Sequence, residues 1–390
     1  MAETSIQSEI TVSSDSVIAK DLKIDGNIYT KDEASQTYKK LDLQADLDFK
    51  AFIARMPAYY NRPNLPTSNH TTITIPANTQ VNIDNAGYVS TEDKTLDIST
   101  LGDASSRAGK DFYIYAVTTS AGELDFVLSA NSTVPDTYNA NNSRKIGGFH
   151  CLCLATGDLG ESHPLSNYAT GDVLPRSIWD LNHRPDCKYP EGKVYNPGAK
   201  IWSGIYLLTW EGTGTTQTLK STFNGVIADG VSEEKFDWYK FAYVLAKQGE
   251  RLPTQLEFIN LSLGSNQQTN IQGTTDPNTT GGHTDTAGRR MISYDGNEDC
   301  CGVMWQWGQE AGSSDSQEWT GLNTSIYPEE IRGDIYWRIR RVLLGGHWGH
   351  SSHCGSLCSA WYDLASTLGS VRGARSVAPP ASGVRGSFEL

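Results

Sequence analysis

Alternation of apolar and polar positions dominates the first half of the chain. Residues 17–29 alternate about Asp25-Gly26, a dipeptide typical of tight hairpin turns, and so predict a β-hairpin. Similar short runs lie between turn residues further along. They predict strands at residues 71–75, 80–83, 111–117, 124–128 and 147–155. Short, closely spaced strands with no helical periodicity between them favour a β-sandwich or barrel.

Helical periodicity marks two other parts of the chain. Residues 31–52 have a helical but thinly apolar pattern, which predicts a segment that needs copies of itself or a larger particle to bury its surface. Residues 236–244 carry apolar side chains at helical spacing, and we expect residues 232–234 (Ser-Glu-Glu) to cap that helix. A further helix is predicted after Thr254, which has Glu257 at capping-box spacing.

The later part of the chain mixes these helices with strands and irregular structure. Residues 264–287 are polar and have no core pattern, which predicts an ordered excursion or a surface loop. Strands are expected at residues 302–307 and 336–344. In the first of these strands, Trp305 and Trp307 are expected to pack in the core.

These patterns divide the chain into parts. Its 390 residues exceed what one hydrophobic core usually organises, so we expect a multidomain protein. Residues 1–57 are expected to form an N-terminal β-rich segment, and residues 58–172 a β-sandwich-like domain. Residues 173–390 form an α+β domain.

Charge and composition exclude several classes of protein. The formal net charge is −13, so nucleic-acid binding would need a local basic patch. The arginines at 338, 340 and 341 alternate with apolar residues, a pattern typical of a solvated or salt-bridged strand face. The chain shows no secretory signal and no apolar run of about 18 residues, so no membrane insertion is expected. Its 7 irregularly spaced cysteines favour buried thiols over a disulfide framework.

Three separated motifs resemble one known fold. Residues 251–258 (Arg-Leu-Pro-Thr-x-x-Glu-Phe), 302–307 (Gly-Val-Met-Trp-Gln-Trp) and 341–348 (Arg-Val-Leu-Leu-Gly-Gly-x-Trp) resemble the C-type-lectin-like fold. The version is the one shared by formylglycine-generating enzymes and by variable proteins of diversity-generating retroelements. Residues 108–117 and 143–155 are similar to a domain that precedes this fold in phage-borne variable proteins. The resemblance thus covers most of the chain.

The two branches of this fold imply different functions. In the generating enzymes, a cysteine pair after the Gly-Gly-x-aromatic strand performs oxidative chemistry. In the retroelement proteins, the same region is a display surface, where asparagine codons become any codon ending in a pyrimidine. Such codons cannot encode Trp, Met, Gln, Lys or Glu. Residues 347–376 contain no Met, Gln, Lys or Glu, which is typical of a diversified surface.

The resemblance implies a variable region at about residues 345–376 and assigns roles within it. Trp348, Trp361, Cys354 and Cys358 are expected to form its fixed scaffold. Ser351, Ser352, Gly369 and Arg372 are further candidates for variation. The expected receptor-binding variable positions are His347, Gly349, His350, His353, Ala360, Tyr362, Asp363, Leu364, Thr367, Leu368, Ser370 and Val371.

Three other kinds of chemistry compete with this interpretation. The histidines of the variable region, together with Cys354 and Cys358, have the donor types of a zinc site, but Gly- and Ser-rich loops are a poor support for tetrahedral ligands. Cys354 and Cys358 could act as an oxidase pair, although no nearby lysine indicates a lowered thiol pKa. The acidic residues 295–299 offer oxygen ligands for calcium, but the calcium motifs of C-type lectins are missing.

The sequence therefore predicts a phage tail-fibre receptor-binding protein, not an enzyme, with no cofactor and no metal. Its expected partners are a host cell-surface receptor (protein or glycan), itself in a homotrimer, and the phage tail or baseplate through the N-terminus. It would be made in the host cytoplasm and located at the tip of a tail fibre of the virion. The alternatives are a formylglycine-generating-type oxidase and a bacterial surface adhesin.

Overall fold

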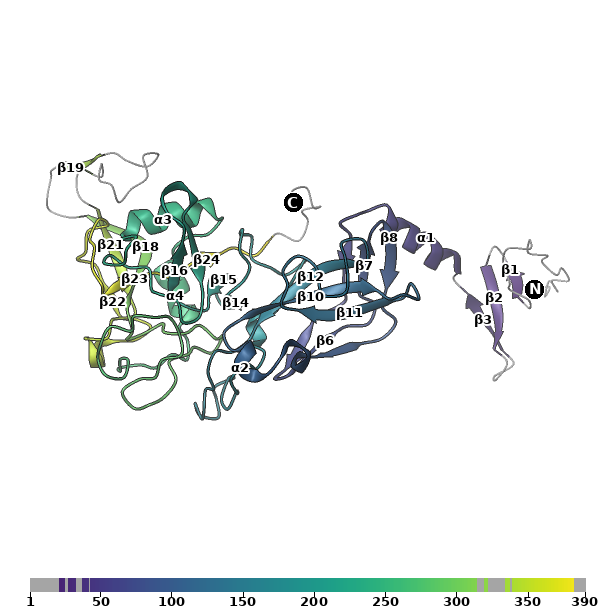
Figure 1. Ribbon diagram of the computed structural model, residues 1–390, viewed down its shortest axis with the longest axis horizontal. Helices are drawn as coiled ribbons and strands as arrows, with labels where there is room; N and C mark the ends of the chain where they lie inside the picture. Colours follow the sequence, from purple (N-terminus) through teal and green to yellow (C-terminus); the bar gives the residue numbers. More distant parts are fainter. Residues whose placement is uncertain are drawn as a thin grey trace, which may run out of the picture.

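The computed structural model describes residues 21–24, 27–32, 37–41, 43–313, 319–321, 334–336 and 339–381. In Figure 1 the N-terminal strands lie at one end of an elongated molecule, and the helices α3 and α4 lie near the other. No helix in these ranges is long and apolar enough to span a membrane. Many short strands in several sheets, with few helices, confirm the predicted β-rich architecture.

The N-terminal strands form a three-stranded antiparallel sheet in the order β1-β2-β3. β1 (Asp21–Ile24) pairs with β2 (Asn27–Asp32), which confirms the strands of the predicted hairpin, while its turn at residues 25–26 lies outside the described residues. The predicted helical segment is only partly correct. β3 (Thr37–Leu41) is a strand because it pairs with β2, and the helix α1 is confined to Leu43–Ala54.

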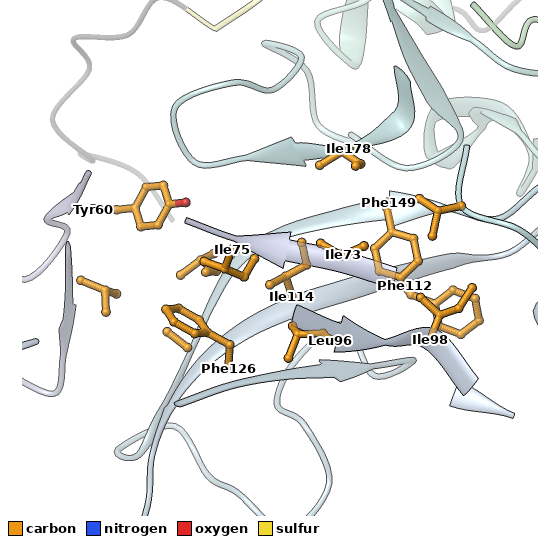
Figure 2. Packing of buried hydrophobic residues seen from close by; sticks show 14 of the residues in the cluster. Tyr60, Ile73, Ile75, Leu96, Ile98, Phe112, Ile114, Phe126, Phe149 and Ile178 are labelled. Atoms are coloured by element: carbon orange, nitrogen blue, oxygen red, sulfur yellow. The ribbon is translucent and has the colours of Figure 1, made fainter. Parts of the chain in front are cut away.

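The second unit encloses one apolar core between small sheets. The alternation in β6 buries Ile73 and Ile75, which meet Phe112 and Ile114 of β10 and Phe126 of β11 (Figure 2). The strands predicted at residues 71–75, 80–83, 111–117 and 124–128 are confirmed as β6, β7, β10 and β11, whereas the strand predicted at 147–155 is Ser143–His150 (β12). The strands of this unit have the orders β4-β7-β8, β5-β6-β9 and β11-β10-β12-β13. Their bounds are Tyr60–Asn61 (β4), Thr67–Asn69 (β5), Thr72–Ile75 (β6), Gln80–Ile83 (β7), Ala86–Val89 (β8), Lys94–Asp97 (β9), Asp111–Thr118 (β10), Leu124–Ser129 (β11), Ser143–His150 (β12) and Trp179–Asp180 (β13), with the short helices Ile98–Leu101 (η1), Ala104–Arg107 (α2) and Pro175–Ser177 (η2).

Buried polar contacts join this unit to the C-terminal part. The imidazole of His150 lies between the Asp111 carboxylate and the Tyr206 hydroxyl, at 3.0 Å from each. Asp111 also accepts a hydrogen bond from the Gly192 amide at 2.9 Å. Because His150 and Tyr206 are almost fully buried, this connection is part of the folded core.

The C-terminal part combines two helices with several small sheets. The central sheet has the order β22-β21-β18-β23, and a second sheet has the order β14-β15-β24. The expected strand at residues 336–344 is interrupted, since residues 337–338 lie outside the described residues. The bounds are Lys193–Asn196 (β14), Ile201–Gly204 (β15), Leu208–Glu211 (β16), Gly214–Thr216 (η3), Thr218–Ser221 (β17), Trp238–Lys247 (α3), Gln255–Leu261 (α4), Trp305–Ser313 (β18), Trp319–Gly321 (β19), Asp334–Tyr336 (β20), Ile339–Leu344 (β21), Ser351–His353 (η5), Ser359–Ala360 (β22), Arg372–Gly373 (β23) and Val377–Ala378 (β24).

Local capping explains where the two helices begin. The capping box predicted for α4 is present, because Thr254 and Glu257 satisfy each other's main-chain amides. The predicted cap of α3 is wrong. Asp237 caps that helix by accepting from the Lys240 amide at 2.9 Å, whereas the Ser232 hydroxyl is used in the turn that precedes it.

Arg341, on the inner strand β21, has specific partners. Arg341 stacks over the Trp238 ring at 3.6 Å and donates a hydrogen bond to the Gln309 carbonyl at 2.8 Å. The expected solvated or salt-bridged face is therefore replaced here by a cation–π contact. Arg338 lies outside the described residues.

Candidate functional site

A double-glycine turn ends β21 and begins the candidate site. Gly345 and Gly346 both have positive φ, +88° and +82°. A Cβ on Gly345 would lie 2.4 Å from the main-chain oxygen of Cys300, and one on Gly346 would lie 2.7 Å from the Cys354 sulfur. Because neither position has room for a side chain, the turn is a fixed starting point for the residues that follow.

Two histidines after this turn pack together over a tryptophan. The rings of His347 and His350 are 4.0 Å apart, and Trp305 lies beneath them with its ring 5.1 Å from that of His350. The Gly349 amide donates to Nδ1 of His347 at 3.0 Å. Burial, followed by the charges of His350 and Arg372, lowers the pKa of His347 to about 4. The pKa of His350 is also lowered, mainly by burial. At neutral pH this part of the site is therefore aromatic and uncharged.

Cys354 is buried and Cys358 is partly buried, and no disulfide joins them. The main chain of Gly345 holds their loop, since its amide donates to the Cys358 carbonyl at 2.9 Å and its carbonyl accepts from Gly355 at 3.2 Å. Burial and the neighbouring Cys358 raise the pKa of the Cys354 thiol to about 12, and burial raises that of Cys358. Such thiols hold very little thiolate at neutral pH, which opposes the oxidase alternative.

The two tryptophans predicted as scaffold differ in their surroundings. Trp348 packs against the core residues Val303 and Met304, and its amide donates to the Val303 carbonyl at 3.1 Å. Trp361 is 41% exposed, and its indole N–H donates to the Ser359 hydroxyl at 3.3 Å. The structure thus places Trp348 below the site and Trp361 on its surface.

The second half of the region presents apolar and aromatic side chains to solvent. Tyr362 is 55% exposed, and Leu368 is also exposed. Val371 packs against the core cluster that contains Trp305. Among the expected variable positions, Gly349, His353, Tyr362 and Leu368 are exposed, as are the further candidates Ser351 and Ser352. Those of intermediate exposure are His347, His350, Ala360, Leu364, Thr367, Ser370 and Val371, with the further candidates Gly369 and Arg372.

Asp363 differs from the other expected variable positions because its side chain is buried. Its carboxylate forms an ion pair with the guanidinium of Arg372, whose own side chain is 15% exposed. A buried, paired carboxylate is not a free contact residue. The periodicity of the sequence offered no sign of this pair.

The polar stretch 264–287 supports the site, a role that the sequence did not reveal. The side-chain carbonyl of Gln267 accepts from the main-chain amide of Ser356 at 2.9 Å. The main-chain amide of Gln268 donates to the Cys354 carbonyl at 2.8 Å. The Asn270 side-chain amide donates to the Trp348 carbonyl. The stretch that was predicted as an ordered excursion or a surface loop is therefore ordered. Its clustered Asn and Gln side chains, which can both donate and accept hydrogen bonds, were the feature of the sequence that could have indicated this supporting role.

The acidic residues considered for calcium already have partners. Asp299 accepts from His283 at 2.8 Å, and Glu298 forms an ion pair with Arg290 at 2.6 Å. Asp295 accepts from Asn196 at 3.0 Å. Within the described ranges, no group of three His, Cys, Asp or Glu side chains is arranged to hold a metal ion.

Comparisons with known proteins cover most of the chain. The family model described as "Mtd second domain" matches residues 64–180. The tail fiber receptor-binding protein of Bordetella phage BPP-1 is 31% identical over 287 residues, which cover 69% of this chain and 71% of that protein. The solved structures of the Major Tropism Determinant M1 and I1 variants match with TM-scores of 0.68 and 0.67 and 26% identity, covering 91% of this chain and 92% of each solved chain. The chain therefore belongs to the Mtd family of phage tail-fibre receptor-binding proteins.

Proposed function

We propose that this chain selects the host of a phage by binding a cell-surface receptor, protein or glycan, through the exposed side chains of residues 347–371. The C-terminal part is assigned to the C-type-lectin-like fold, which presents these residues on one surface. Family membership supports receptor binding as the activity. The contact between this surface and the receptor forms no covalent bond and needs no cofactor.

The observation that carries the proposal is a group of exposed aromatic and apolar side chains on a rigid support. Tyr362 and Trp361 are 55% and 41% exposed, and Leu357 at the tip of the cysteine loop is 74% exposed. Each lies in a segment pinned to the central sheet by main-chain hydrogen bonds. Large side chains of this kind are the residues that dominate binding energy at protein interfaces.

Diversification of this surface belongs to the same proposal. The exposed positions can change with little effect on the free energy of unfolding because they have few buried contacts. The fixed turn at Gly345 and Gly346, by contrast, has no room for any side chain. The lack of Met, Gln, Lys and Glu in residues 347–376 agrees with codons that end in a pyrimidine.

Attachment and assembly complete the proposed role in the virion. The N-terminal sheet of three short strands lies apart from the larger core, and a sheet of this size is stable only when it buries an apolar face or packs against another element. We therefore assign it to the attachment and trimerisation of the fibre. A trimer would present three copies of the surface and raise avidity through effective concentration.

The test replaces exposed side chains and measures adsorption of virions to host cells. Tyr362→Ala and Leu368→Ala should each reduce adsorption several-fold or more, because anchor residues typically contribute over about 1 kcal/mol. Leu256→Ala is the matched control, since this leucine is 74% exposed on α4, outside the proposed surface. Equal adsorption by all three variants and the unaltered virion would contradict the proposal.

Population sequencing of the gene tests diversification separately. Substitutions should concentrate at the exposed variable positions, while Trp348, Cys354, Cys358 and Trp361 stay constant. Uniform conservation across residues 347–371 would instead indicate a dedicated binding site.

A further inference from the structure

The ion pair between Asp363 and Arg372 closes a loop within the proposed surface. Both side chains are largely buried, with 7% and 15% of their area exposed. The residues between them, 364–371, include the exposed Leu368. Because a charge-assisted hydrogen bond is stronger than a neutral one, the contact is suited to fixing the two ends of this loop relative to each other.

The main chain at each end of the loop is held by the central sheet. The Asp363 carbonyl accepts from the Arg341 amide of β21 at 3.0 Å. At the other end, β23, which begins at Arg372, pairs in parallel with β18. Between these points, the Ala365 amide donates to the Ile339 carbonyl at 2.9 Å and its carbonyl accepts from the Trp238 amide at 3.1 Å. The carbonyls of Gly369 and Val371 accept from the amides of Gly230 and Trp305 at 3.3 and 3.0 Å. The part of the loop that depends most on its ends is therefore residues 366–368, where the Thr367 amide bonds only within the loop, to the Leu364 carbonyl at 2.9 Å.

Arg372 also faces the histidines in the first half of the surface. Its charge contributes to the lowered pKa of His347, together with burial and His350. The charged and titratable groups that meet here are therefore Arg372, Asp363, His347, His350 and, through His350, His353. The Asp363 carboxylate neutralises the cation beside an otherwise uncharged aromatic group.

We propose that Asp363 and Arg372 are positioning residues that clamp the loop 364–371 in its receptor-binding conformation and keep this face of the protein electrically neutral. The inference rests on the proposed function, since it concerns the same surface. It predicts that the surface favours a partner without a strong charge at the point of contact. It also predicts that Asp363 does not vary independently of Arg372.

Amide hydrogen exchange of the full chain without receptor tests the clamp. Asp363→Asn and Arg372→Gln should each speed exchange within residues 364–371 by about tenfold or more, while β18 and β21 keep their protection. The double variant should exchange no faster than either single variant, because each single substitution already breaks the ion pair. Asp363→Glu keeps a carboxylate, so the amides of residues 364–371 should exchange nearly as slowly in this variant as in the unaltered chain. Glu92→Gln removes an exposed carboxylate elsewhere and serves as the control.

A histidine titration by NMR supplies a second, electrostatic measurement. Arg372→Gln removes a cation and should raise the pKa of His347, whereas Asp363→Asn leaves that cation unpaired and should not raise it. A purely structural role would move the pKa of His347 in the same direction in both variants. That result, or additive exchange rates in the double variant, would overturn the clamp even if the adsorption variants behave as expected.

Discussion

Single side chains determine how much charge the exposed face carries. His347 and His350 lie against each other and against Trp305, so their rings are partly shielded from water. Burial disfavours the protonated form of an imidazole. The face therefore contains histidines that act as aromatic groups over the neutral pH range.

This environment predicts a specific dependence of stability on pH. The pKa of His347 is about 4 in the folded chain and about 6.5 when unfolded, so the unfolded chain takes up the proton first as pH falls. The free energy of unfolding should therefore decrease from pH 6.5 to pH 4. His347→Asn removes this contribution. Urea denaturation should therefore show that the free energy of unfolding of the variant decreases less between pH 6.5 and pH 4 than that of the unaltered chain. An unchanged slope in the variant would contradict the assignment.

At the scale of elements, the turn after β21 fixes where the exposed region starts. Gly345→Ala should lower the free energy of unfolding by at least about 2 kcal/mol, because the new Cβ meets the main-chain oxygen of Cys300 at a positive φ. Gly122→Ala is the matched control. Its φ is +79° but no atom lies within 4 Å of the new Cβ, so only the backbone strain of about 1–2 kcal/mol applies. Equal losses in the two variants, measured by chemical denaturation, would show that the contact with Cys300 is unimportant.

The sequence predicted several strands and the capped helix α4 correctly, and its errors lie where pairing or packing decides between two local possibilities. The capping box at Thr254 was correct because its hydrogen bonds join residues three apart. β3 was mistaken for helix because its strand identity depends on β2. The start of α3 was misplaced because both Ser232 and Asp237 can cap a helix, and packing selects Asp237.

The internal contacts of the candidate site could not be predicted from the sequence. The resemblance and the codon pattern predict only which region varies, and within it Gly349, His353, Tyr362 and Leu368 are exposed. The burial of Asp363 depends on Arg372, which lies across a loop, and no periodic pattern encodes such a contact. The support from Gln267 and Asn270 comes from a distant stretch whose polarity suggested only a surface loop.

At the scale of the whole molecule, one buried arginine connects several parts of the core. Arg375 is fully buried, and its guanidinium donates to the carbonyls of Gly204 and Ile205 at 2.6 Å each and to the side-chain carbonyl of Gln306 at 3.2 Å. It also donates to the carbonyl of Glu298. Segments far apart in the chain thus meet at a single side chain.

Replacing this arginine should destabilise the molecule as a whole. Arg375→Met removes the guanidinium from four buried carbonyls, of which Gly204 and Ile205 keep a second donor in the Asn297 side chain and the Glu298 amide. The Glu298 main-chain and Gln306 side-chain carbonyls lose the donor that Arg375 supplies, so the free energy of unfolding should fall by about 3 kcal/mol or more. Arg55→Met, at an exposed position directly after α1, should change the free energy of unfolding by less than about 0.5 kcal/mol. Calorimetry of the two variants measures the difference. A small loss in Arg375→Met would mean that water or repacking satisfies these carbonyls.

The contacts made by the polar stretch 264–287 have a consequence for inheritance. Gln267, Gln268 and Asn270 reach main-chain atoms of residues 356, 354 and 348, and every amino acid but proline offers the same amide and carbonyl groups there. A substitution other than proline at any of these three residues therefore keeps the main-chain group that the distant stretch binds. Part of what holds the exposed region in place is thus encoded outside that region, while Gly345, Gly346 and Arg375 contribute stability from beside or within it. Changes among the exposed side chains can therefore accumulate without a compensating change in the distant stretch.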